Sequence, residues 1–330
     1  MFTKINFIVA LAVIFTAVSV WAQDGDRIKI ETNLVSVPVV VSDRDGRYVP
    51  NLTARDFTVY QDGQAQPIEF FAATEEPLTI AVLIDTSQST RPVLDDIKDS
   101  ADSFIKLLQP RDRAMVVSFD YDTHVLSPLT SSHDQLKRAV DNAEIPRDAG
   151  TVLRDAAYET ITRTLAPIKG RKAVIILTDG KDAGSDISSS ELFYALQETD
   201  TLVYGIQFRT EDRRVAEYAL RNGHFPREKV GTSQRQSNEE RKSAVAGEFM
   251  DRMARATAAR FFSTDAGKLK GTFETILDKL RRQYRLGFYP PDNTPNDDRI
   301  HDVRVMVMRA GLIVRARAGY RLGTRPPETH

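Results

Sequence analysis

The chain has 330 residues and a formal net charge of −1, which is long enough for one large or two modest domains with a proper core. Hydrophobic residues make up 41% and charged residues 28%, as in ordinary globular proteins, and the balanced charge excludes a broad basic field for nucleic acid. There is no cysteine, which excludes disulfides, thiolate metal sites, cysteine nucleophiles and a thioether-linked lipid anchor.

The first 22 residues have the pattern of a signal peptide. Lys4 precedes an apolar run from Phe7 to Val20, and Val20 and Ala22 fit the −3 and −1 positions of a cleavage site. A retained membrane anchor is the alternative, but the run is shorter than the roughly 20 residues that a spanning helix needs. We therefore expect cleavage before Gln23 and export to the periplasm, the cell surface or the medium.

Residues 23–76 are predicted to form the N-terminal part of a β-domain. Between Ile28 and Phe71 apolar and polar residues alternate with period two, and the turns "DRDGR" and "QDGQ" separate the runs. Asp-Gly supplies the positive-φ positions that tight turns between antiparallel strands require.

Residues 77–280 change to a pattern typical of an α/β domain. Buried-strand runs at 78–85, 113–120, 172–179 and 201–208 alternate with amphipathic helical stretches, and 125–130 is a possible edge strand. This alternation predicts a Rossmann-like, mostly parallel sheet with helices on both faces. A hydrophilic insert at 209–246 is expected to be an exposed excursion, partly helical or mobile, followed by a helix at 247–259.

Residues 281–330 return to period two. The segments "YRLGFYP", "DVRVMVMRAG" and "LIVRARAGYRL" predict three strands. The economical architecture is an α/β domain inserted into a small β-sandwich-like domain that is built from both ends of the chain. Two separate small β-domains are the alternative.

Three polar signals follow predicted strands of the α/β domain. They are Asp85, Ser87 and Ser89 in "DTSQS", Thr151 after a flexible Gly150, and Asp179 in "LTDG". Ligands bind beyond the carboxyl ends of strands in parallel sheets, so these side chains are expected to meet. Each signal alone is also explained by ordinary turn or helix-capping chemistry; their order and topology together carry the prediction.

These residues match the three motifs of the metal-ion-dependent adhesion site of the von Willebrand factor type A (VWA) domain, which the chain resembles over roughly 78–280. The resemblance implies a site for Mg²⁺, Mn²⁺ or Ca²⁺ at the top of the sheet. By the same resemblance, the three hydroxyls coordinate the ion, the two aspartates bind it directly or through water, and one position is left for a partner's carboxylate.

The chemistry of the donors agrees with that role. A small, hard cation takes oxygen ligands and gives up water reluctantly. Two carboxylates balance its charge, while neutral hydroxyls leave it electrophilic toward an external Asp or Glu. We therefore expect an exported, non-enzymatic module that binds a partner protein.

The flanking segments resemble the VWFA-related proteins that were first grouped from acidobacterial genomes, which are exported and carry a β-domain beside the A domain. One departure is local. Where those relatives usually carry Thr-Gly-Gly after the penultimate helix, this chain has Thr257, Ala258 and Ala259. The departure puts the local turn in doubt, but not the metal site.

Four further aspartates lie close to the motifs in sequence. Asp120 and Asp122 are either turn residues in solvent or an outer layer of the site, Asp155 is expected on a helix surface, and Asp182 can line the rim. In the alternative of a metal-dependent hydrolase, Asp120, Asp122 and Asp182 are the weak candidates for a general base. A structural ion without a partner is the third hypothesis.

Other catalytic classes have no motif. The histidines are scattered and show no zinc-ligand spacing; they are His124, His133, His224, His301 and His330. There is no G-x-S-x-G elbow, Walker loop or dinucleotide-binding glycine pattern. Nothing singles out a carboxylate pair for glycoside chemistry.

Overall fold

The computed structural model describes residues 34–73, 76–148, 150–209, 232–265, 268–291, 293–295 and 299–322. The predicted signal peptide, residues 1–22, and most of the predicted insert lie outside these ranges. Among the residues described, no helix combines the length and apolar character needed to cross a membrane.

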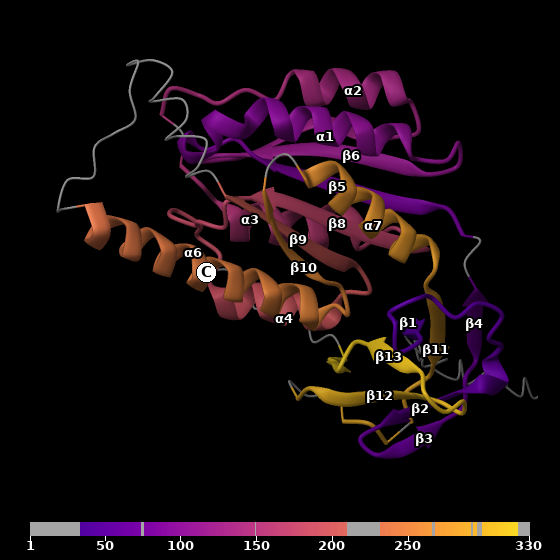
Figure 1. Ribbon diagram of the computed structural model, residues 1–330. Coiled ribbons are helices and arrows are strands. Elements are labelled where there is room, and N and C mark those ends of the chain that lie inside the picture. Colours follow the sequence, from indigo (N-terminus) through magenta and orange to yellow (C-terminus); the bar gives the residue numbers. More distant parts are fainter. Residues whose placement is uncertain are drawn as a thin grey trace, which may run out of the picture. The chain divides into compact units, whose positions relative to one another are not determined.

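A six-stranded sheet forms the centre of the α/β part (Figure 1). The strand order is β10-β9-β8-β5-β6-β7, with all neighbours parallel except the pair of β6 and β7. The strands are β5 (Leu78–Asp85), β6 (Arg113–Phe119), β7 (Thr123–Thr130), β8 (Arg171–Thr178), β9 (Leu202–Arg209) and β10 (Phe261–Asp265). The mostly parallel sheet and its edge strand are confirmed.

Helices cover both faces of this sheet because its central strands are apolar on both sides. Every residue of β5 is buried: Ile80 and Val82 join one core cluster, and Ala81 and Leu83 join the other. The helices α1 (Leu94–Lys106), α2 (His133–Asp141) and α7 (Leu269–Arg281) contribute to the first cluster. The second takes residues from α3 (Leu153–Glu159), α4 (Ser189–Glu198) and α6 (Thr232–Ala256).

The long helix α6 differs from its prediction. It spans Thr232–Ala256, whereas the apolar period placed the helix at 247–259. The early part, "TSQRQSNEERKS", has no apolar stripe, so periodicity could not show a helix there. The second half of the predicted hydrophilic insert is therefore the first half of this helix.

Strands from both ends of the chain pair in two antiparallel sheets, of order β13-β1-β11-β4 and β14-β12-β2-β3. Val37 pairs with Leu286, and Val59 pairs with Val305. The strands are β1 (Val35–Ser42), β2 (Phe57–Gln61), β3 (Gln64–Gln66), β4 (Phe70–Ala73), β11 (Tyr284–Phe288), β12 (His301–Val307), β13 (Ile313–Ala316) and β14 (Gly319–Tyr320). Their inward apolar residues share a third core cluster, so the expected antiparallel β part beside the α/β sheet is confirmed.

At the amino-terminal edge of the central sheet, the buried Asp112 joins three segments. Its Oδ1 accepts the Leu78 N–H (2.9 Å), and its Oδ2 accepts the Gln109 N–H (2.8 Å) and Arg281 Nη2 (2.6 Å). Burial opposes ionisation here, but the hydrogen bonds from Arg281 and the two amides outweigh it and hold the pKa of Asp112 below its ordinary value. This carboxylate fastens α7 and the start of β5 to the loop before β6.

Candidate metal centre

Asp85 ends β5 at the carboxyl edge of the sheet and is fully buried. Its Oδ1 accepts the Ser87 N–H at 2.9 Å, and its Oδ2 accepts the Thr178 hydroxyl at 2.5 Å. Thr178 is the last residue of the neighbouring parallel strand β8. Adjacent parallel strands end at one edge, so the two loops that follow them lie side by side.

Asp179, the residue after β8, is 5% exposed. Its Oδ1 accepts the Lys181 N–H at 3.3 Å. Its Oδ2 is buried and has no hydrogen-bond donor, although the Lys181 ammonium lies 3.1 Å from it as an ion pair. A buried carboxylate oxygen without a donor is uncommon in a folded protein, and it marks this atom as a candidate ligand for a cation.

The two aspartates act on each other. Burial raises the pKa of Asp85, and the carboxylate of Asp179 raises it further, to about 7. Two buried carboxylates whose charges oppose each other lower the stability of the fold unless a cation or a proton compensates them. Lys181 compensates one of the two carboxylates, so the ionised pair still carries a net negative charge.

The hydroxyls of the "DTSQS" loop lie beside these carboxylates. Ser87 Oγ and Ser89 Oγ are 3.0 Å apart, and the N–H of Ser87 is the group that donates to Asp85. Thr90 holds the loop closed, because its hydroxyl contacts the carbonyl oxygens of Asp85 (3.0 Å) and Ser87 (2.8 Å). Thr90 therefore builds the loop, and the two serines are its candidate ligands.

Thr151 is buried and is tied through its backbone to the loop after Asp179. The N–H of Ala183, in the loop after Asp179, donates to the Thr151 carbonyl at 3.0 Å. Gly150, before Thr151, packs against the exposed ring of Tyr121: a Cβ there would lie 2.2 Å from Tyr121 Cε1, so a larger residue would have to displace this ring. The flexibility expected at Gly150 stays a prediction.

The five predicted ligands are therefore brought together to different degrees. Asp85, Ser87 and Ser89 share one hydrogen-bonded loop, Asp179 interacts with Asp85 through charge, and Thr151 is connected to the loop after Asp179. Within the part of the chain that the structure describes, no three His, Asp or Glu side chains form a metal-ligand cluster. A cation at this edge would take the rest of its coordination from neutral oxygens, for which the serine and threonine hydroxyls are the candidates.

Asp120 differs from the expectation of a turn residue in solvent, because it is only 6% exposed. Its Oδ1 accepts the N–H groups of Tyr121 (2.6 Å) and Asp122 (3.3 Å), and His124 Nε2 lies 3.4 Å away. Its carbonyl accepts the N–H of Val152, next to Thr151, at 2.8 Å. Asp120 builds the turn that supports Thr151, while Asp122 is exposed as expected.

The other two aspartates fasten the loop before α4. Asp182 Oδ2 accepts the Arg154 N–H (3.0 Å) and the Ser185 hydroxyl (2.9 Å). Asp155 accepts the N–H groups of residues 186 and 187 rather than standing on a bare helix surface. Both carboxylates hold α3 to this loop, and for Asp182, one of the three general-base candidates of the hydrolase alternative, this is a structural role.

Two residues of the site were not singled out from the sequence. Thr178 donates to Asp85 and also accepts the Gly180 N–H at 2.9 Å. Lys181 places an ammonium beside Asp179. The available signal was position alone, since both flank Asp179 within "LTDGK". Their chemistry follows from the approach of β8 to β5, which no local pattern encodes.

The residues at this edge fit a divalent cation. Two buried carboxylates supply charge, one of their oxygens lacks a donor, and a pair of serine hydroxyls lies on the same loop as Asp85. Oxygen donors of this kind suit Mg²⁺, Mn²⁺ and Ca²⁺.

Comparison with known sequences agrees with the assignment of the domain. The sequence model of the von Willebrand factor type A domain matches residues 80–181, a stretch that contains all five candidate ligands. The resemblance to the VWA domain is thereby confirmed. The narrower resemblance of the flanking segments to the VWFA-related proteins stays a prediction. No curated protein matches the chain.

Several solved structures are similar. Proximal thread matrix protein 1 of the mussel byssus, with a zinc-occupied MIDAS motif, is 16% identical over 67% of this chain and 49% of its own, with a TM-score of 0.48. A von Willebrand factor type A protein from Catenulispora acidiphila is 14% identical over 81% of this chain and 73% of its own, with a TM-score of 0.46. The vWF domain of the type V pili tip protein Mfa5 from Porphyromonas gingivalis is 11% identical over 63% of this chain and 96% of its own, with a TM-score of 0.45. This chain spans about half the length of the mussel protein. The strand order, rather than these similarities, establishes the fold.

Proposed function

We propose that the von Willebrand factor type A domain of this chain is a metal-dependent protein-binding module. Asp85, Ser87, Ser89, Thr151 and Asp179 hold a divalent cation, Mg²⁺ first among the candidates. When bound, the cation supplies an electrophilic position that accepts a carboxylate oxygen from an Asp or Glu of a partner protein. The module is not an enzyme, and it acts outside the cytoplasm after removal of residues 1–22.

One observation carries the proposal: Asp179 Oδ2 is buried and has no hydrogen-bond donor, next to the fully buried Asp85. A purely structural loop pairs its buried carboxylates, as Asp112 does at the other edge of the same sheet. An incompletely paired carboxylate is stabilised by an external cation, so binding and folding are coupled at this edge.

The surrounding residues keep the donors in place. Thr178 orients the Asp85 carboxylate, Thr90 closes the serine loop, and Asp120 supports the segment that carries Thr151. Few side chains of the site must reorganise before a ligand binds, which preserves affinity for a weakly held partner group. Two carboxylates balance the charge of the ion, and the remaining ligands are neutral hydroxyls, which leave it electrophilic toward an incoming carboxylate oxygen.

The test is capture of partners from the native envelope fraction by the immobilised full chain, in Mg²⁺ and in EDTA. We expect capture in Mg²⁺ that is lost in EDTA and lost with Asp85→Ala. The matched control is Asp186→Asn, which makes the same change of charge at an exposed position of the loop after Asp179.

Calorimetric titration of Mg²⁺ and Mn²⁺ into the same three proteins separates the two parts of the proposal. Metal binding that persists in Asp85→Ala contradicts the ligand assignment. Metal binding without any metal-dependent capture contradicts the partner and favours a structural ion. Equal capture by the Asp85→Ala variant in EDTA contradicts the mechanism as a whole.

A further inference from the structure

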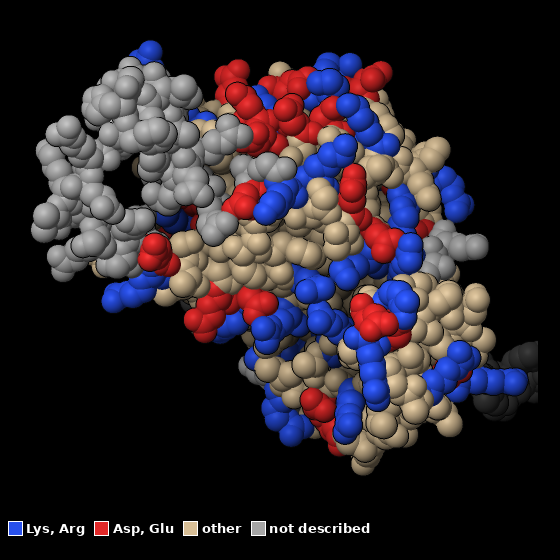
Figure 2. Space-filling model, in the orientation of Figure 1, with Lys and Arg blue, Asp and Glu red and all other residues tan. Residues whose placement is uncertain are grey.

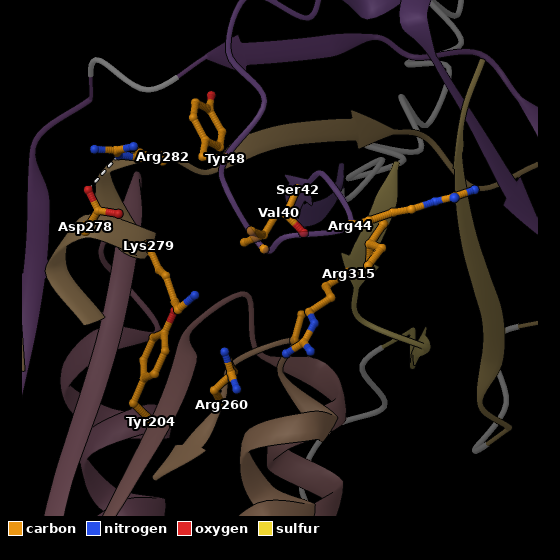
Figure 3. A pocket seen from close by; sticks show the side chains of 13 residues that line it. Val40, Ser42, Arg44, Tyr48, Tyr204, Arg260, Asp278, Lys279, Arg282 and Arg315 are labelled. Atoms are coloured by element: carbon orange, nitrogen blue, oxygen red, sulfur yellow. Dashed lines mark ion pairs between the residues drawn. The ribbon is translucent and has the colours of Figure 1, made fainter. Parts of the chain in front are cut away.

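A second candidate site lies away from the metal centre, in a cavity of about 160 Å³ (Figure 3). Five segments that are distant in sequence form its walls: β1 with the turn after it, β9, the turn between α6 and β10, the end of α7, and β13. The volume is large enough for an anionic group together with several water molecules.

Positive charge dominates the lining. Five cationic side chains border the cavity, and among its lining residues the one carboxylate is Asp278. The cations are Arg44, Arg260, Lys279, Arg282 and Arg315. Figure 2 shows the same imbalance on the surface, where Lys and Arg gather between α7 and β13 while Asp and Glu gather over α1 and α2.

The carboxylate is already engaged. Asp278 Oδ1 lies 2.6 Å from Arg282 Nε as an ion pair, and the Arg282 guanidinium also lies over the Tyr48 ring, 6.0 Å from its centroid. The nearby acids Asp43 and Asp45 are paired with Arg47. Asp278 also acts on Lys279, but a single carboxylate compensates only part of the charge of the five lining cations.

Three cations share the cavity. Lys279, Arg260 and Arg315 point toward the same space in Figure 3, whereas Arg44 extends away from it. Burial lowers the pKa of Lys279, and the charges of Arg260 and Arg315 lower it further. The three groups therefore interact, and their mutual repulsion remains until an anion enters.

We propose that this cavity binds a phosphate group, held by Lys279, Arg260 and Arg315. Two guanidinium groups can each form paired hydrogen bonds with phosphate oxygens, and the lysine adds a compact charge between them. A phosphate group matches this site better than a single carboxylate because it carries more than one charge and has oxygens for all three cations. The Tyr204 hydroxyl, which points toward Lys279, is a further donor at the same wall. This site needs no divalent metal and does not rest on the proposed function.

Inorganic pyrophosphate is the probe, titrated into the full chain in EDTA at low ionic strength by calorimetry. We expect saturable binding that Lys279→Met and Arg260→Gln each weaken at least tenfold. The matched control is Lys270→Met, on the exposed face of the same helix α7 and outside the cavity, which should bind as the unchanged protein does.

Melting temperatures provide the second readout. Because Lys279 is half-buried among like charges, Lys279→Met is expected to fold with an equal or higher melting temperature and to lose the rise that pyrophosphate causes. Equal pyrophosphate affinity in Lys279→Met and the unchanged chain contradicts the site. Equal weakening in Lys270→Met and Lys279→Met also contradicts it, since that result indicates general screening.

Vesicles distinguish a lipid head group from a free phosphate compound. Co-sedimentation with phosphatidylglycerol vesicles that exceeds that with phosphatidylcholine, and that falls in Lys279→Met but not in Lys270→Met, assigns the site to a lipid phosphate. Binding of pyrophosphate without such co-sedimentation assigns it to a soluble one. Vesicle binding that is unchanged in Lys279→Met, with no pyrophosphate binding, overturns the proposal.

Discussion

Two buried aspartates at opposite edges of the central sheet have opposite surroundings. Asp112, at the amino-terminal edge, accepts two backbone N–H groups and a guanidinium, and its pKa lies below the ordinary value. Asp85, at the carboxyl-terminal edge, accepts one N–H and one hydroxyl. Burial and the neighbouring Asp179 raise its pKa.

The difference separates stability from binding within one sheet. Full pairing of Asp112 stabilises the fold without any ligand, because each oxygen already has donors. Asp85 also has a donor at each oxygen, but its burial beside the carboxylate of Asp179 costs stability in the metal-free chain, and a bound cation removes that cost. The comparison predicts that substitution of Asp112 lowers the stability of the fold, whereas the equivalent substitution of Asp85 lowers the affinity for the metal.

The largest expected effect is that of Asp112→Asn on the free energy of unfolding. Asparagine has one acceptor oxygen and one NH₂ group. Its NH₂ must face either the Leu78 N–H or the pair formed by the Gln109 N–H and Arg281, and in both cases two hydrogen-bond donors oppose each other. We expect Asp112→Asn to cost about 3 kcal/mol. This is a low value for the loss of a buried, hydrogen-bonded partner of a charge, because Arg281 is partly exposed. Denaturant unfolding measures it.

The same variant has a signature in acid. The pKa of Asp112 in the folded protein lies below its ordinary 3.8. The ionised carboxylate therefore contributes its full stabilisation at any pH above the pKa of Asp112 in the unfolded chain. This stabilisation is lost as the pH falls through the lower pKa of the folded state. The difference between the two proteins should be constant near neutral pH and shrink in strong acid. A difference that grows in acid contradicts the assignment.

Next in size is the effect of Asp85→Asn on metal affinity. The substitution removes one of two carboxylates from the site, and we expect Mg²⁺ affinity to fall by about 100-fold, or roughly 2.7 kcal/mol. In EDTA the variant should be as stable as the unchanged chain, or more stable, because the repulsion with Asp179 is gone. Melting temperatures with and without Mg²⁺ measure both effects.

Asp112→Asn is the reciprocal control for this experiment. It should lower the melting temperature in EDTA and in Mg²⁺ alike and keep the stabilisation that Mg²⁺ adds. If Asp85→Asn lowers the stability of the metal-free chain as much as Asp112→Asn does, the two edges do not differ in the way proposed.

A smaller effect is expected at Lys181, which lies 3.1 Å from Asp179 Oδ2. Its ammonium stabilises the metal-free carboxylate and opposes the approach of a cation. Because the side chain is about one third exposed, solvent screening limits the effect, and Lys181→Met should tighten Mg²⁺ binding by about three- to tenfold. Lys169→Met, at the other end of β8, is the control; equal affinity in both variants would remove Lys181 from the site.

The sequence predicted the α/β fold well because its strands are apolar throughout and its helices carry apolar stripes. Period two at 28–71 and from Tyr284 onward likewise indicated the antiparallel strands, although it could not show that β1 pairs with β11 or β2 with β12. The start of α6 was missed because propensity without an apolar stripe leaves no periodic signal.

For the candidate sites, the sequence supplied the ligands but not their environment. Asp85, Thr151 and Asp179 could be placed at one edge because parallel strands end together. The role of Thr178 depends on the contact of β8 with β5, and the burial of Asp179 Oδ2 without a hydrogen-bond donor depends on the tertiary fold. The basic cavity could not be predicted at all, since its walls come from five segments that only the tertiary fold brings together.

The smallest expected effect tests the departure noted at Thr257, Ala258 and Ala259. The turn forms despite the missing glycines: Val203 N–H donates to Thr257 Oγ1 at 2.9 Å, and Ala259 N–H donates to the Ala254 carbonyl at 2.8 Å. This second bond closes the end of α6 as a Schellman-type cap, with Ala258 in the left-handed region at φ 64°.

That conformation costs a non-glycine residue about 1–2 kcal/mol, whereas glycine adopts it freely but loses about 0.5–1 kcal/mol of chain entropy on folding. Ala258→Gly should therefore stabilise the protein by about 0.5–1 kcal/mol, a rise in melting temperature of roughly 1–4 °C. Ala259→Gly is the matched control. Because Ala259 is buried and has no positive φ, this substitution should destabilise the protein. If both substitutions change the stability in the same direction, the left-handed backbone at Ala258 is not the cause of the effect.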